Sequence, residues 1–282
     1  MSAVATPGVA FAKGLVRDRR AAFGFALVLI AVLAAIAAPL IAPFDPDTPD
    51  FGAALAPPSA MHLLGTDDLG RDVLSRVIFG ARISLFVGFF SVAGALFLGT
   101  GLGLVAGYFG GLADSIIMRV MDVVFAFPSI LLALAIAAVL GPSLVNAVLA
   151  IAIVNLPVFA RIARAQTLVV RQLDFVEAKR ALGFGTANIL FRTVMPNTLA
   201  PIVVQGSLLF AAAIITESYL SFLGLGAQPP TPTWGNMLRN AIGFLDFAPW
   251  LAWFSGAAIF LTVLGFNLLG DALRDIFDPR EG

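Results

Sequence analysis

The chain has 282 residues and a mean hydropathy of +0.97; 60% of its residues are hydrophobic and only 12% are charged. This composition excludes an ordinary soluble globule, because a protein of this length cannot bury so much apolar surface. The 17 basic and 17 acidic residues cancel, which excludes a nucleic-acid binder acting through net positive charge. The chain has a single histidine, His62, and no cysteine, which excludes thiol catalysis, cysteine-bound metals and disulfides.

Five runs without Asp, Glu, Lys, Arg or His predict the membrane-spanning helices: Ala21–Phe44, Ile83–Ala113, Val123–Ala160, Thr193–Thr216 and Phe247–Gly270. One crossing of a hydrocarbon core takes roughly 20 apolar residues. The third run is too long for one crossing, and its Gly141-Pro142-Ser143 turn signal divides it into Val123–Leu140 and Leu144–Ala160. We therefore expect an all-α membrane protein with six transmembrane helices.

The distribution of Lys and Arg predicts the orientation, since cytoplasmic loops carry an excess of both. With the N-terminus inside, thirteen basic residues fall on the cytoplasmic side and four outside, so we expect both termini in the cytoplasm. A cleaved signal peptide is the alternative for the basic start, but the first apolar run is longer than the core of about 7–15 residues typical of such peptides. The predicted division is a cytoplasmic segment 1–20, a first helix 21–44, an external segment 45–82, a five-helix core 83–273 containing a cytoplasmic loop 161–196, and a cytoplasmic tail 274–282.

The external segment begins with an acidic, turn-rich stretch and changes character at Asp68. From there, apolar residues recur at positions 69, 73, 74, 77 and 78, a helical spacing that predicts a short amphipathic helix on the outer membrane face. This helix either contacts an external partner or the pore mouth, or only seats the next membrane span.

The second apolar run contains Gly99, Gly103 and Gly107. Glycines four residues apart share one helix face and let a neighbouring backbone approach closely, so we expect a packing surface within the bundle or against a second subunit. The alternative is chance, because the chain has 27 glycines.

The cytoplasmic loop 161–196 is rich in arginine and carries signals for a helix. Asp174 and Glu177 fit a capping box at the start of a helix Phe175–Leu182. We expect this helix to end at Gly183, because glycine readily adopts the left-handed cap conformation.

A second short helix is expected over about Ala187–Val194, ending before Pro196. A pair of short helices attached to two membrane spans can transmit force between those spans and a partner that docks on the loop. The alternative is a plain basic loop that satisfies the charge bias of the cytoplasmic side.

Glu217 stands at the end of the fifth apolar run. A carboxylate at membrane depth is costly and usually faces a cavity or a partner. It is therefore either a pore-lining or gating group, or an interfacial glutamate hydrogen-bonded to a neighbouring helix.

The cytoplasmic loop also carries a motif. The stretch Glu177-Ala178-Lys179-Arg180-Ala181-Leu182-Gly183, followed after twelve residues by Pro196, resembles the EAA loop of ATP-binding-cassette importer permeases. That pattern reads Glu-Ala-Ala, three residues, Gly, nine residues, Ile, one residue, Leu-Pro. The matching residues are Glu177, Ala178, Gly183 and Pro196; Lys179 replaces the second alanine, Thr193 the isoleucine and Met195 the leucine.

Longer segments narrow the resemblance to the second, or "C"-type, permease subunits of dipeptide, oligopeptide and nickel importers. The resemblance runs from about residue 20 to 280, and its clearest segments are Leu64–Arg76, Gly80–Leu85, Glu217–Gly224, Gln228–Gly235 and Phe266–Asp275.

This resemblance implies a type I importer permease fold that forms half of a translocation pathway for di- or oligopeptides, with nickel chelates, opines or glutathione as alternative substrates. It implies a multi-pass protein of the bacterial inner membrane whose partners are a second homologous permease, two cytoplasmic ATP-binding subunits, an external substrate-binding protein and the lipid bilayer, but no nucleic acid. The residues implied to form the ATPase-coupling loop are Asp174, Glu177, Ala178, Gly183 and Pro196.

The chain has no Gly-x-x-x-x-Gly-Lys-[Ser/Thr] phosphate loop. We therefore expect no catalysis, no cofactor and no metal in this chain, with ATP and magnesium bound by the ATPase subunits. Two other classes of protein fit less well. An ion-driven secondary transporter needs several buried ionisable groups, and only Glu217 is a candidate. A membrane-embedded enzyme would need a motif such as His-Glu-x-x-His or Gly-x-Ser-x-Gly, which the sequence lacks.

Overall fold

The computed structural model describes residues 18–277. Most of the predicted cytoplasmic segment 1–20 and of the predicted tail 274–282 therefore lies outside the described residues. Within them the chain forms helices joined by turns and loops and no strand, which confirms the all-α class. The elements are α2 Arg19–Ile41, η1 Phe51–Ala53, α3 Val73–Phe109, α4 Gly111–Phe125, α5 Ser129–Leu140, α6 Leu144–Val170, α7 Asp174–Ala181, α8 Thr186–Ile189, η2 Leu190–Val194, α9 Met195–Phe222, α10 Trp234–Ala241, η3 Ile242–Phe244 and α11 Trp250–Phe277.

Among the described residues, five helices are long and apolar enough to cross a membrane: α2, α3, α6, α11 and the continuous helix Thr186–Phe222 built from α8, η2 and α9. The helices α4 and α5 meet this test only as a pair, and they are bent by 91° at their junction. Counting the pair as one span gives the expected six. A straight helix over Val123–Leu140 is wrong, because Pro128 has no backbone N–H to donate and disfavours helical backbone at Phe127.

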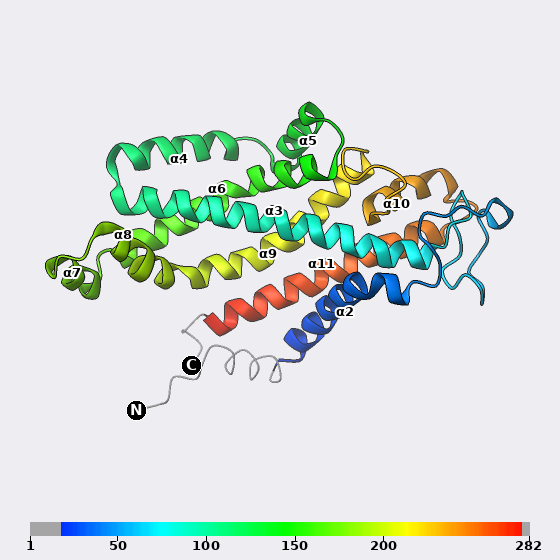
Figure 1. Cartoon of the computed structure of the whole chain (residues 1–282), viewed down its shortest axis with the longest axis horizontal. Helices are drawn as coiled ribbons and strands as arrows, with labels where there is room; N and C mark the ends of the chain where they lie inside the picture. The colour runs from blue at the N-terminus through cyan, green and yellow to red at the C-terminus, as the bar shows by residue number, and fades with distance from the viewer. Residues whose placement is uncertain (1–17, 278–282) are drawn as a thin grey trace.

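Figure 1 shows an elongated bundle with α7 at one end and the segment 45–72, together with α10, at the other. The helices α3 and α6 pack along each other through the middle of the bundle, and α2 packs on α11. The first residues of α2 and the last residues of α11 lie toward the end that carries α7.

The amphipathic helix expected from Asp68 does not form as a separate element. Gly70 has a φ of +77°, which an α-helix does not allow, and Asp72 caps α3 by accepting a hydrogen bond from the Ser75 backbone N–H at 2.8 Å. From Val73 the helix then runs for 37 residues without a break. Positions 73–82 are therefore the first turns of a membrane span.

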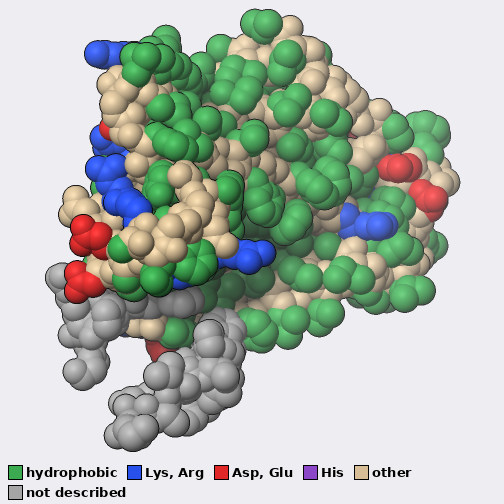
Figure 2. Space-filling model, turned by 60° about the vertical axis from the view of Figure 1, so that its left-hand side comes forward, with side chains coloured by type: hydrophobic (Ala, Val, Ile, Leu, Met, Phe, Trp, Pro, Cys, Tyr) green, Lys and Arg blue, Asp and Glu red, His purple; other side chains and the backbone are tan. Residues whose placement is uncertain are grey.

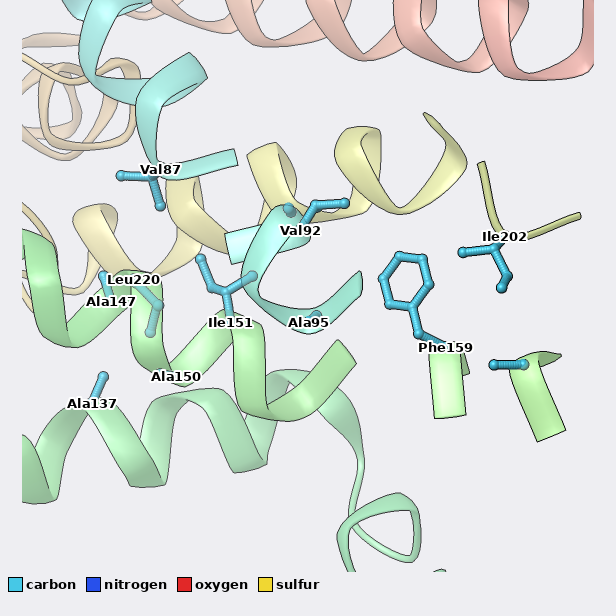
Figure 3. Packing of buried hydrophobic residues seen from close by; sticks show 12 residues of the cluster. Val87, Val92, Ala95, Ala137, Ala147, Ala150, Ile151, Phe159, Ile202 and Leu220 are labelled. Carbon is cyan, nitrogen blue, oxygen red and sulfur yellow. The ribbon is translucent and has the colours of Figure 1, made fainter. Parts of the chain in front are cut away.

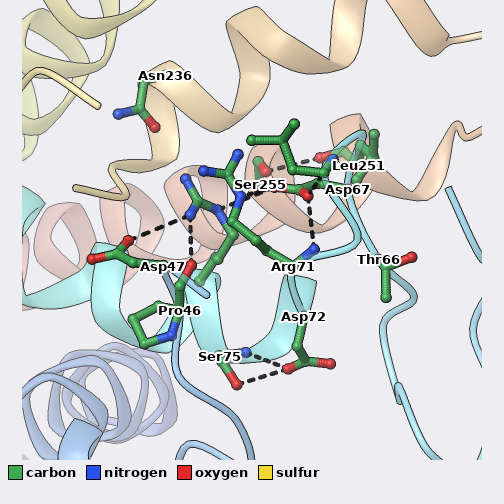
Figure 4. Close-up of polar contacts among 12 residues, drawn as sticks. Pro46, Asp47, Thr66, Asp67, Arg71, Asp72, Ser75, Asn236, Leu251 and Ser255 are labelled. Carbon is green, nitrogen blue, oxygen red and sulfur yellow. Dashed lines mark hydrogen bonds and ion pairs between the residues drawn. The ribbon is translucent and has the colours of Figure 1, made fainter. Parts of the chain in front are cut away.

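The segment 45–72 is an irregular layer held by buried charges. The Asp67 carboxylate accepts from Arg71 Nε at 2.8 Å, and Arg76 donates to the Pro46 carbonyl oxygen at 2.6 Å (Figure 4). Both guanidinium groups are almost completely buried. Breaking such a buried pair leaves one charge buried without a partner, which is strongly destabilising. This network therefore fixes the layer to the start of α3.

The hydrophobic core lies between α3, α5, α6 and α9 (Figure 3). Val87 and Val92 of α3 face Ile151 and Phe159 of α6, and Ile202 of α9 closes the same cluster. Lipid tails are as apolar as these side chains, so close packing, and not exclusion of water, holds the helices together.

Candidate functional site

Gly99, Gly103 and Gly107 lie on the face of α3 that touches α6. A Cβ atom added at Gly99 would lie 2.7 Å from the Leu156 carbonyl oxygen, and one at Gly107 would lie 2.8 Å from the Arg164 carbonyl oxygen. Only glycine lets the two helix backbones approach so closely. The surface against which this row packs is thus a helix of the same chain.

The helix α7 begins one residue earlier than expected and has no capping box. Leu173 is the extended N-cap residue, and its carbonyl oxygen accepts from the N–H groups of Val176 and Glu177. Asp174 is the first helical residue, not the residue before the helix, so its side chain makes no cap hydrogen bond. The carboxylates of Asp174 and Glu177 still favour this end of the helix, because it is the positive end of the helix dipole.

Gly183 ends α7 as expected, with a φ of +78°. Its N–H donates to the Arg180 carbonyl oxygen at 3.1 Å, and the Phe184 N–H donates to the Lys179 carbonyl oxygen at 3.1 Å. These two bonds form a Schellman motif, which reverses the chain toward α8.

Residues 171–185, here called the α7 loop, are anchored on one side. Val176 is fully buried against Ile189 and Val194. Lys179 Nζ donates to Thr193 Oγ1 at 2.8 Å, so a hydrogen bond joins two of the positions at which the sequence departs from the EAA pattern. Buried contacts and this bond join α7 to the start of the long helix Thr186–Phe222.

The other side of the α7 loop is exposed. The Leu182 side chain is 76% exposed, and Phe175 and Phe184 are 43% and 45% exposed. Charged and small residues are exposed beside them, among them Asp174, Glu177, Ala178 and Arg180. Large apolar side chains exposed together mark an interaction surface. In Figure 2 most basic side chains lie on the side of the molecule that belongs to this end, whereas the broad face of the bundle is hydrophobic.

A polar pocket of about 410 Å³ lies where α7 approaches the end of α3. Arg171 donates to the Gly107 carbonyl oxygen at 2.8 Å, and the Arg180 guanidinium lies 6.0 Å from the centre of the Tyr108 ring. Glu177 lines the same pocket, so the loop presents both signs of charge beside its apolar surface.

The second short helix expected over Ala187–Val194 does not end before Pro196. The chain passes from α8 through the π-helical turn η2 into α9 as one continuous helix, Thr186–Phe222. Pro196 directly follows the first residue of α9, just after the π-helical turn, and Asn197 Nδ2 donates to the Thr193 carbonyl oxygen at 2.6 Å. One continuous helix, here called the rod, therefore joins the α7 loop to the far end of α9.

Glu217 lies near that far end and is 1% exposed. Its carboxylate accepts hydrogen bonds from Ser84 Oγ of α3 at 3.0 Å and from Ser221 Oγ of α9 at 2.6 Å. Both serine side chains are buried as well. The geometry is that of a carboxylate bonded to a neighbouring helix, and Glu217 joins α9 to α3 at the end of the bundle opposite to α7.

A cavity of about 380 Å³ lies at the junction of α4 and α5, against α6 and α9. Ser129, Asn155 and Thr216 are the polar residues of its otherwise apolar lining. Irregular backbone at membrane depth is tolerated only where it is buried in protein or lines a water-filled cavity, and this cavity adjoins the break at Pro128. In the sequence, only the polar Asn155 within an apolar run indicates this cavity.

The chain matches two families of known proteins. The family described as "Binding-protein-dependent transport system inner membrane component" matches residues 99–282, and "N-terminal TM domain of oligopeptide transport permease C" matches residues 6–58.

Curated relatives match nearly the whole chain. The dipeptide transport system permease protein DppC of Alkalihalophilus pseudofirmus is 48% identical over 95% of this chain and 88% of its own length. The glutathione transport system permease protein GsiD of Pectobacterium atrosepticum is 47% identical over 98% of this chain and 92% of its own length.

Among solved structures, a chain of the inward-facing MetNI methionine ABC transporter has a similar fold, with a TM-score of 0.59 at 16% identity. The match covers 73% of this chain and 98% of that one.

Proposed function

This chain belongs to the family of inner-membrane components of binding-protein-dependent transport systems, and we propose that it forms one half of the translocation pathway of an ATP-driven importer of di- or oligopeptides. The observation that carries the proposal is the α7 loop, which is fixed on its buried side to a membrane-spanning rod and presents an apolar surface on the other. Relatives named for dipeptide and glutathione transport support a short peptide as substrate.

The proposed orientation puts the α7 loop and both termini in the cytoplasm and the segment 45–72 outside. The excess of Lys and Arg on the α7 side supports it. The starting residues of α2 and the final residues of α11 both lie toward the α7 end, the side that carries this excess.

In the proposed cycle, two cytoplasmic ATP-binding subunits dock on the α7 loops of this chain and of a second, homologous permease. Those subunits bind ATP and magnesium, and this chain hydrolyses nothing. Their closure displaces α7, the rod Thr186–Phe222 tilts with it, and the cavity at the α4–α5 junction changes access from one side to the other. Substrate arrives from an external binding protein.

Replacing Gly183 with valine is expected to uncouple ATP hydrolysis from uptake in the assembled complex. No atom lies within 4 Å of a Cβ at Gly183, but its φ is +78°, which costs a β-branched residue about 1–3 kcal/mol and changes the end of α7. Gly185→Val is the control, because that site is equally open and its φ is −65°. The measurement is peptide uptake per ATP hydrolysed in proteoliposomes, which should fall severalfold in G183V alone.

Equal ratios in the two variants would remove the α7 loop from the coupling path. Uptake by the wild-type complex should also require ATP and the external binding protein. Uptake that persists without ATP in the presence of a proton gradient would instead identify an ion-driven transporter.

A further inference from the structure

A cleft of about 500 Å³ opens at the end of the bundle opposite to α7. Its walls come from four parts of the chain: residues 45–47, the start of α3, the start of α6 at Leu144, and the loop before α10 at Thr231 and Pro232. Its volume lies within the roughly 300–1,000 Å³ typical of small-molecule sites. The proposed orientation puts this cleft on the external face, where substrate arrives.

The cleft holds one cation without an acidic partner. Among the described residues, no carboxylate lies within 4 Å of the Arg82 guanidinium, and the side chain is exposed. Arg71 and Arg76 at the same end are both buried and paired with aspartates. Arg82 is therefore not needed for the network that fixes the external layer.

The cleft also holds an acidic group without a cation. Asp45 Oδ1 accepts from the backbone N–H groups of Asp47 and Thr48, at 2.8 and 3.2 Å, which orients the carboxylate. In the range 18–277, no Lys, Arg or His nitrogen lies within 4 Å of it. Asp47, also in the cleft, is 3.6 Å from Arg76 and so is already engaged.

Apart from Thr231, the remaining lining is apolar and partly aromatic. Phe79, Ile83 and Phe86 come from α3, and Leu144 and Pro232 face the same space. The Arg82 guanidinium lies 6.0 Å from the centre of the Phe79 ring and, within the described part of the chain, has no acidic partner, and Asp45 has no cationic partner there. Together with the apolar surface, these two charges match a molecule with a free carboxylate, a free ammonium group and apolar side chains.

We infer that this cleft is an entry site that receives a short peptide with free termini after its release from the binding protein, with Arg82 binding the carboxylate end and Asp45 the ammonium end. The inference rests on the proposed function and specifies where the peptide first contacts this chain. Charge-assisted hydrogen bonds of this kind are about twice as strong as neutral ones, so the site favours free peptides over blocked ones.

Photo-crosslinking in the assembled complex tests the position of the site. Phe86 is replaced by photoreactive benzoylphenylalanine, and Phe97, 75% exposed on the same helix but outside the cleft, is replaced in a control. Radiolabelled alanyl-phenylalanine is delivered by the binding protein. Label is expected at position 86 and not at position 97. Peptide uptake without label at position 86 would overturn the inference. If the wild-type complex took up no peptide at all, the proposed function would be overturned as well.

The charge requirement is tested in the position-86 photoreactive background. Arg82→Gln should lower labelling by alanyl-phenylalanine about tenfold, whereas Arg239→Gln, which removes an exposed arginine outside the cleft at the same end, should not. The C-terminal amide of the peptide has no carboxylate for Arg82 to bind. It should therefore label position 86 equally weakly with and without the Arg82→Gln substitution. Labelling that R82Q leaves unchanged would assign Arg82 to lipid headgroups and overturn the inference.

Discussion

Replacing Gly103 with leucine is expected to lower the amount of assembled transporter in the membrane roughly tenfold or more. A Cβ at this position would lie 2.7 Å from the Ala163 Cβ and closer still to the Ala160 carbonyl oxygen. The clash is with backbone and a Cβ, which cannot rotate away, so α3 and α6 must separate. Overpacking of this kind costs about 1–3 kcal/mol or more, and each 1.4 kcal/mol is about a factor of ten.

Gly101 provides the matched control on the same helix. Nothing lies within 4 Å of a Cβ at Gly101, so Gly101→Leu adds the same side chain to an open face. Both variants are compared by size-exclusion chromatography of the detergent-extracted complex. Assembly of G103L at the wild-type level would mean that the close approach of α3 and α6 does not hold the subunit together.

Replacing Glu217 with alanine is expected to lower the thermal stability of the complex and to weaken the link between α3 and α9. The substitution leaves the buried hydroxyl groups of Ser84 and Ser221 without their acceptor and opens a cavity. An unmet buried hydrogen-bonding group costs about 1–3 kcal/mol, and the lost packing adds to it.

Glu217→Gln separates the loss of hydrogen bonding from the loss of charge. Glutamine keeps the volume and one acceptor oxygen, so its unfolding temperature should lie between those of the wild type and Glu217→Ala. Thermal unfolding of the purified complex, followed by loss of the monodisperse peak, gives the order. An unfolding temperature of E217A equal to that of the wild type would show that the hydrogen bond to Ser84 does not stabilise the packing of α3 on α9.

Features determined by short stretches of the chain could be predicted from the sequence. The end of α7 at Gly183 follows from the conformational freedom of one residue, and the family follows from ordered matches such as Glu177 to Gly183. The spans α2, α6 and α11 follow from uninterrupted apolar runs, because the bilayer imposes one length on all of them.

Features that depend on neighbouring elements could not be predicted from the sequence. Pro128 was one proline in a long apolar run, and only its place between two helices shows that it breaks a membrane span by 91°. Pro196 was expected to stop a helix, but a π-helical turn before it and the Asn197 side chain let the helix continue. The cleft beside Arg82 combines four distant segments, so no local pattern announces it.

The lengths of α3 and of the rod Thr186–Phe222 set the height of the α7 loop above the lipid. Each has 37 residues and so measures about 55 Å, whereas a bilayer with its headgroups is about 40–45 Å thick. About 10–15 Å of each therefore projects beyond the headgroups. Excess length at the α7 end lifts the loop clear of the phospholipid surface, so that a bulky globular subunit reaches Leu182 and Phe184 without displacing lipid.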